Sequence, residues 1–156
     1  MSSPMPFVVW RCFSREDGGA TWSPVTLVST SAGQQLFGAI ADDPSTGTIN
    51  IAYYSTENDF FQLRPQVFLA QILPGTTSVG KTQLLTSASA DVQASPPIVE
   101  LDQPEFFGSQ IGIAATGTGI AGESTTYVSF TWTSVAGTYD GVSSPDVNNH
   151  LATFQY

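Results

Sequence analysis

A tight turn near the start of the chain constrains its fold more than any other feature. Residues 14–22 lie between an apolar run at 7–13 and a β-prone run at 25–28. Asp17 can accept a hydrogen bond from the backbone two residues on, and the Gly18-Gly19 pair adopts positive φ without steric cost. Thr21 and Trp22 then favour a new strand. We therefore expect a β-hairpin around this turn, formed by 7–13 and 22–29.

The rest of the chain alternates between short β-prone runs and turns. Residues 42–47 have the composition of a turn, residues 74–81 that of a loop, and residues 125–133 the cleanest alternation of apolar and polar side chains. No segment has the period of a long amphipathic helix. The sequence therefore predicts an all-β fold, with further strands at 36–41, 48–54, 67–73, 82–86, 107–115, 125–133 and 151–156.

An internal repeat groups these strands. Phe37-Gly38 recurs as Phe107-Gly108, seventy positions later, and each pair precedes an apolar strand, a turn and an aromatic-rich strand. The repeat predicts two outer strands, then one complete four-stranded unit, then three strands of another.

The turn at 14–22 resembles the Asp box of the sialidase-like β-propellers, because Asp17, Gly19, Thr21 and Trp22 match its pattern. Arg15 stands where that box has a serine. In the family the box closes the hairpin between the third and fourth strands of a blade and is a folding device. The resemblance implies a single partial domain, an incomplete β-propeller of four-stranded antiparallel blades. Its parts would be the end of one blade (1–30), one full blade (31–87) and most of a further blade (88–156).

The chain is short for a propeller. Closed propellers have at least four blades of about 40 to 50 residues each, whereas this sequence has 156 residues. An incomplete propeller leaves sheet edges and blade faces uncovered. We therefore expect either self-association or a remainder of the chain that is missing here.

Charge excludes several partners. Thirteen acidic residues against four basic ones give a net charge of −9, which repels phosphate backbones and anionic lipid, so we expect no nucleic-acid or membrane partner.

The low charged fraction of 11% is common in extracellular β proteins, and with the resemblance it favours an extracellular location. The first residues lack the basic and apolar regions of a signal peptide. Cys12, the single cysteine, is expected to be a buried thiol.

The blade topology that the resemblance implies also indicates where a ligand would bind. In such a blade the connections opposite the Asp-box end carry the site, and here these would be loops at 55–66, 87–106 and 136–149. Carboxylates and exposed aromatic rings in such loops suit carbohydrate binding, a possible glycan partner, and equally suit plain solvated loops. The candidate ligand-face residues are Glu57, Asp59, Arg64, Asp102, Glu105, Tyr139 and Asp140.

No catalytic residue can be assigned from the sequence. If the chain is an enzyme, the resemblance implies an exo-sialidase-like glycoside hydrolase, which needs three arginines around the substrate carboxylate. Arg15 lies in the Asp-box turn and Arg11 lies beside it, which leaves only Arg64 for the ligand face. We expect no cofactor and no metal, since His150 has no histidine or cysteine partner and the acidic pairs lack the spacing of a calcium loop.

Two further functions stay open. One is a structural or interaction module, a partial propeller completed by self-association. The other is a nucleotide binder, because residues Gly75 to Thr82 match the spacing of a phosphate-binding loop, with Lys81 and Thr82 as phosphate and magnesium ligands. That loop must open a helix, so this hypothesis requires a helix starting near Gly80.

Overall fold

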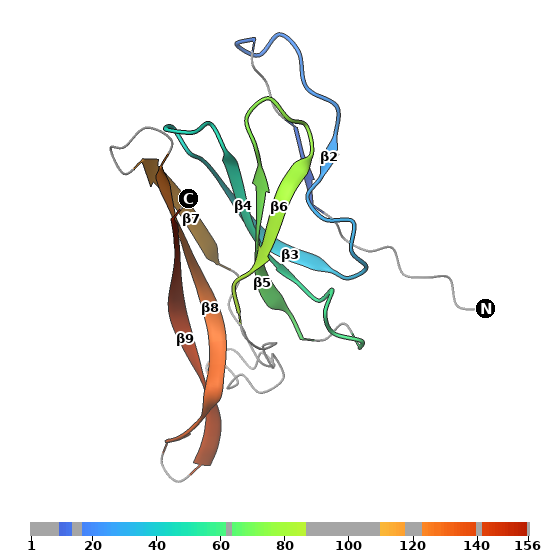
Figure 1. Ribbon diagram of the computed structural model, residues 1–156. Helices are drawn as coiled ribbons and strands as arrows, with labels where there is room; N and C mark the ends of the chain where they lie inside the picture. Colours follow the sequence, from blue (N-terminus) through green and yellow to red (C-terminus); the bar gives the residue numbers. More distant parts are fainter. Residues whose placement is uncertain are drawn as a thin grey trace, which may run out of the picture.

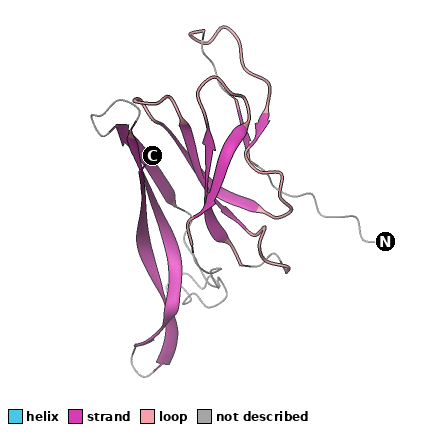
Figure 2. Cartoon of the chain, in the orientation of Figure 1, coloured by secondary structure: helices cyan, strands magenta, loops and turns pink. Residues whose placement is uncertain are grey.

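The computed structural model describes residues 10–13, 17–61, 64–86, 110–117, 123–139 and 142–155, and within these ranges the chain is all-β (Figures 1 and 2). Its strands form three antiparallel sheets, in each of which neighbours in sequence are neighbours in space. The sheets have two, four and three strands. The strands are β1 (Arg11–Cys12), β2 (Thr26–Leu27), β3 (Gln35–Asp42), β4 (Ile49–Ser55), β5 (Gln66–Ile72), β6 (Val79–Leu84), β7 (Ile111–Gly117), β8 (Ser124–Tyr139) and β9 (Val142–Gln155).

The strand grouping predicted from the repeat is confirmed, but several boundaries were wrong. Among the described residues of the first hairpin, strand pairing is confined to Arg11 and Cys12 with Leu27 and Thr26. Strand β6 begins at Val79, inside the expected loop. Of the residues 136–149, expected to be a loop, 136–139 belong to β8 and 142–149 to β9, and the two strands pair as far as Tyr139 and Val142. This long hairpin extends well beyond the other strands (Figure 1).

The four-stranded sheet β3–β6 forms the middle layer, and its two central strands are buried on both faces. On one face Ala52 and Tyr54 pack with Val128 and Phe130 of β8. On the other face Ile51 and Tyr53 pack with Val28, which follows β2. Each large apolar side chain buried in this way contributes about 1.5 to 3 kcal/mol. Burial on both faces explains why β4 and β5 read as continuous apolar runs rather than alternating ones.

The connections at one end of the middle sheet are tight and hydrogen-bonded. The Asp17 turn, the Asp43 turn between β3 and β4 and the turn between β5 and β6 all lie at the upper end in Figure 1. The Thr26 hydroxyl donates to the carbonyl of Thr77, which ties the first hairpin to the β5–β6 turn. The connection between β4 and β5 lies at the opposite, lower end.

Cys12 is partly rather than fully buried, which corrects the expectation from sequence. It packs at the margin of the apolar cluster that contains Val28. Burial raises the pKa of its thiol, so the thiolate, which is the reactive form, is disfavoured.

Candidate functional site

The turn at Asp17 has the geometry of a hairpin-closing device. The Asp17 carboxylate accepts hydrogen bonds from the Gly19 N–H at 3.2 Å and from the Thr21 hydroxyl at 2.6 Å. The hydrogen bond from the Thr21 side chain holds the pKa of Asp17 below its usual value. Gly18 and Gly19 have φ of 68° and 103°, and the ring of Trp22 meets that of Phe13 edge to face at 6.3 Å. These contacts confirm the predicted turn. Both carboxylate oxygens of Asp17 accept hydrogen bonds from residues of the same turn.

The structure has a strand where the nucleotide-binding hypothesis requires a helix. Lys81 lies inside strand β6 and pairs with Gln71 of β5, at the position where a phosphate-binding loop needs a helix. Gly75 has φ of 71° and belongs to the turn that joins β5 to β6. The glycine and lysine spacing therefore reflects a strand-to-strand turn.

The candidate ligand-face residues are only partly brought together. Glu57, Asp59 and Arg64 follow β4, at the end of the sheet opposite the Asp17 turn, and the Arg64 N–H donates to Asp59 at 3.1 Å. Tyr139 ends β8, opposite Val142, and so lies in a strand rather than in the expected loop. Asp102, Glu105 and Asp140 lie outside the described residues.

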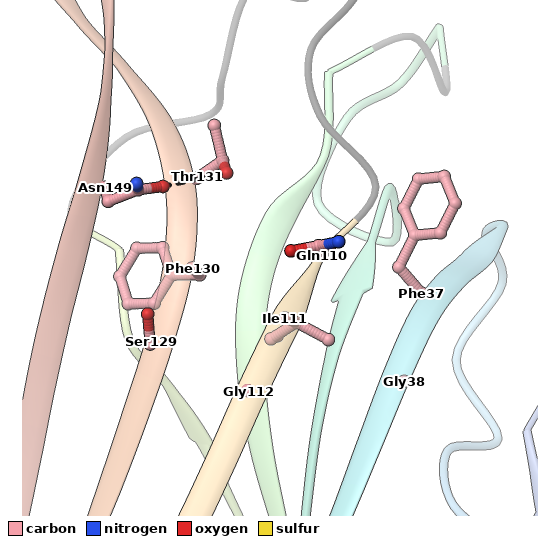
Figure 3. A pocket seen from close by; sticks show the side chains of 9 residues that line it. All are labelled: Phe37, Gly38, Gln110, Ile111, Gly112, Ser129, Phe130, Thr131 and Asn149. Atoms are coloured by element: carbon pink, nitrogen blue, oxygen red, sulfur yellow. Dashed lines mark hydrogen bonds between the residues drawn. The ribbon is translucent and has the colours of Figure 1, made fainter.

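A pocket of about 460 Å³ opens between the middle sheet and the β7–β9 sheet, near the same lower end; we call it the inter-sheet pocket. Strand β3 forms one wall and strands β7 to β9 the other (Figure 3). Neither Glu57, Asp59 nor Arg64 lines it. Its lining residues are Phe37, Gly38, Gln110, Ile111, Gly112, Ser129, Phe130, Thr131 and Asn149.

Phe37 is the most unusual residue of this pocket. It has φ of 42°, the only positive φ of a non-glycine residue in the described chain, and it sits in a β-bulge between Leu36 and Gly38. The bulge turns the ring outward, and Phe37 is 44% exposed. Its ring still meets that of Tyr54 edge to face, with the two ring centroids 6.3 Å apart. A phenylalanine held in this region costs of order 1 kcal/mol, and such strain and bulges concentrate at functional sites.

The polar groups of the pocket are amides and hydroxyls. The Thr131 hydroxyl donates to Asn149 Oδ1 at 3.2 Å. Because this hydrogen bond uses the amide oxygen, the amide nitrogen of Asn149 can donate to a ligand. Gln110 and Ser129 add a second amide and a second hydroxyl (Figure 3). None of the nine lining residues is ionisable. The pocket can therefore stack an apolar ring face and exchange hydrogen bonds with hydroxyls, but it offers no acid, base or carboxylate clamp.

Sequence reasoning did not select these residues. The sequence marks Phe37 only as part of the repeat, and Asn149 only as the end of an expected loop. The signal that could have found the pocket is the Phe-Gly pair, since Gly38 admits the close approach of Trp10 and Phe37 is exposed near the start of β3.

No long apolar helix of the kind that crosses a lipid bilayer occurs in the part of the chain that the structure describes. Over those same residues, no three acidic, histidine or cysteine side chains lie close enough together to hold a metal ion.

Comparison of the chain with protein-family models, with curated proteins and with solved structures finds no match in any of the three.

Proposed function

We propose that this chain is a segment of a sialidase-like β-propeller that binds neutral glycans in the inter-sheet pocket without hydrolysing them. The observation that carries the proposal is the pocket lining, an exposed aromatic ring beside amides and hydroxyls. Aromatic rings stack on the apolar faces of sugars, and neutral amides and hydroxyls exchange hydrogen bonds with sugar hydroxyls.

Stacking of the sheets supports the propeller part of this proposal. Consecutive blades of a propeller pack face to face, and here the two-, four- and three-stranded sheets pack in chain order, each against the next. The tight turns share one end of the middle sheet (Figure 1), as hairpins within blades would.

The charge pattern supports binding of neutral rather than sialylated sugars. An acidic sugar needs a cationic partner, usually a bidentate arginine, and no arginine lines the pocket. The net charge of −9 further opposes an anionic ligand. Glycoside hydrolysis needs carboxyl groups as acid or base, and in sialidases a tyrosine as the nucleophile, and the lining residues contain neither.

Titration calorimetry with neutral trisaccharides, and with the same trisaccharides carrying a terminal sialic acid, tests the proposal. We expect the neutral forms to bind more tightly, and Phe37→Ala to weaken binding about tenfold, the loss of one ring contact. Phe60→Ala is the matched control, because Phe60 is 91% exposed at the same end of the sheet but does not line the pocket. Equal losses in both variants, or preference for the sialylated forms, contradict the proposal.

We also propose self-association, favoured by apolar side chains on the outer faces of the two end sheets. Leu27 of β2 is 43% exposed and Leu151 of β9 is 66% exposed, and in a complete propeller neighbouring blades would cover such faces. Light scattering should find a discrete oligomer that Leu151→Glu dissociates. A monomer at high concentration contradicts this second proposal.

A further inference from the structure

A second groove, separate from the inter-sheet pocket, runs between the first hairpin and the edge of the middle sheet. It has a volume of about 560 Å³. One wall is the continuous segment 25–31, and the other is formed by Thr77, Ser78, Val79 and Thr82 of the β5–β6 turn and of β6. Glu57 lines it as well. We call it the β2 groove.

The main chain of β2 has an unused edge along this groove. The Val28 N–H donates to the Trp10 carbonyl at 3.0 Å, and Leu27 lies opposite Arg11. Hydrogen-bonded and non-hydrogen-bonded pairs alternate in an antiparallel ladder, so the N–H and C=O of Leu27 face away from β1. No described strand pairs with that side of β2.

Of the described residues that line the groove, Glu57 alone is ionisable, and its carboxylate is held in place by hydrogen bonds. Its Oε2 accepts hydrogen bonds from the Ser29 hydroxyl at 3.3 Å and the Ser55 hydroxyl at 3.1 Å. Gly33 approaches so closely that an added Cβ would lie 2.7 Å from the Glu57 backbone. Within the described ranges, no residue donates a hydrogen bond to Oε1 and no lysine or arginine forms an ion pair with the carboxylate.

We propose that the β2 groove binds an extended peptide that carries a lysine or arginine, pairing main chain to main chain with Leu27 and placing the cationic side chain on Glu57. An open strand edge supplies the hydrogen bonds of strand addition, and the neighbouring side chains supply specificity. The charge complementarity is local at Glu57 and is reinforced by the net charge of −9. The groove lining contains no aromatic ring, which favours a peptide over a sugar here.

The probe is a fluorescein-labelled hexapeptide of alternating valine and threonine with one central lysine, and its counterpart with a central glutamate. Fluorescence anisotropy should show binding of the lysine peptide and at least tenfold weaker binding of the glutamate peptide. A lysine peptide N-methylated at alternate residues, on the edge that would face β2, should also lose binding, because it cannot donate to the strand edge.

Glu57→Gln is the decisive variant, since the amide oxygen can still accept both serine hydroxyls. We expect about tenfold weaker binding of the lysine peptide, with an unchanged urea midpoint. Asp42→Asn removes the same charge from an exposed position outside the groove and should change affinity less than twofold.

Hydrogen exchange reports the pairing directly, because bound peptide should slow exchange of the Leu27 amide. Equal binding of the lysine and glutamate peptides, equal effects of Glu57→Gln and Asp42→Asn, or an unprotected Leu27 amide each overturn the proposal. Binding of a glucosamine trimer in the groove with no binding of the peptide overturns it too, in favour of an amine-bearing sugar. The inter-sheet pocket shares none of these residues, so Phe37→Ala should leave peptide binding intact.

Discussion

The hydroxyl of Tyr54 makes both main-chain hydrogen bonds with Thr131 that a residue of a neighbouring strand would otherwise make. It donates to the Thr131 carbonyl at 2.8 Å and accepts from the Thr131 N–H at 2.9 Å. The ladder between β7 and β8 ends one residue earlier, at Ile111 and Phe130. Tyr54 therefore satisfies the first two main-chain groups of β8 that β7 leaves unpaired, and it ties the middle sheet to the β7–β9 sheet beside the inter-sheet pocket.

Removal of this hydroxyl should destabilise the protein. We expect Tyr54→Phe to lower the free energy of unfolding by about 1 to 3 kcal/mol, because it leaves a partly buried main-chain donor and acceptor without the tyrosine hydroxyl. Tyr53→Phe is the matched control, since the Tyr53 hydroxyl is buried on the opposite face, near Ser29 but without a hydrogen bond of ordinary geometry to any described residue. Its removal should change stability by less than about 0.5 kcal/mol. Urea unfolding of both variants measures the difference, and equal losses contradict the role assigned to Tyr54.

Both tyrosines also predict a loss of stability at alkaline pH. Burial raises the pKa of Tyr54 to about 12. Burial, together with the negative charge of Glu57, raises that of Tyr53 to about 12, although the nearby Ser29 hydroxyl opposes the rise. Because the folded state holds these protons more tightly, their stabilisation is complete below pH 10 and is lost as pH rises from about 10 to 12. Melting temperatures across this range should fall steeply, and less so in the double phenylalanine variant; equal slopes contradict the prediction.

The hydrogen bonds of Asp43 should make the folded state less stable at acid pH. Burial alone would raise its pKa, but hydrogen bonds from Ser124, Thr46 and Ser45 outweigh burial and hold the pKa far below 3.8. A depressed pKa stabilises the fold above the ordinary value, and this stabilisation is lost as pH falls below about 4. Asp43→Asn should therefore flatten the acid unfolding profile and destabilise the protein at pH 7 by about 1 to 3 kcal/mol. Asp42→Asn, a substitution of the exposed neighbour, should leave the profile unchanged.

Local patterns predicted the strands because each depends on residues close in sequence. The Asp17 turn and the Asp43 turn are held by hydrogen bonds between residues a few positions apart, and the structure confirms both. It also confirms the alternation in which Tyr127 is exposed and Val128 is buried. The long β8–β9 hairpin was missed because Gly137 and Pro145 are typical of loops. In the structure Gly137 pairs with Ser144, and Pro145 lies where the register shifts, a position that tolerates proline.

The site could not be predicted for a different reason. Tyr54 and Thr131 are 77 positions apart, and no sequence period specifies which sheets stack. The outward turn of Phe37 depends on a bulge in the pairing of β3 with β4, which the run at 36–41 does not reveal. Residues selected for charge, such as Asp59 and Arg64, instead bond within their own connection.

Two glycines in the inter-sheet pocket should respond differently to alanine. A Cβ on Gly38 would lie 2.9 Å from the indole of Trp10, whereas one on Gly112 would meet only Ser129 at 3.9 Å. Gly38→Ala must displace the indole and should cost about 1 to 3 kcal/mol. Gly112→Ala should be neutral or slightly stabilising, because alanine loses less backbone entropy in a strand. Urea unfolding with tryptophan fluorescence measures both, and similar effects of the two substitutions contradict the packing of Trp10 on Gly38.

Substitution of Phe37 by glycine should weaken sugar binding while leaving stability nearly unchanged. Glycine adopts φ of 42° without strain, so Phe37→Gly should recover about 1 kcal/mol of backbone strain. The same change removes the edge contact with Tyr54, which is worth about 0.5 to 1.5 kcal/mol. The two terms nearly cancel, and we expect a free energy of unfolding within about 1 kcal/mol of the native value, together with neutral trisaccharide binding that is about tenfold weaker, as in Phe37→Ala. Calorimetric titration and urea unfolding of one preparation measure both quantities. A variant that keeps binding shows that the ring is not part of the sugar site, and one that loses several kcal/mol shows that the bulge is a requirement of folding rather than of binding.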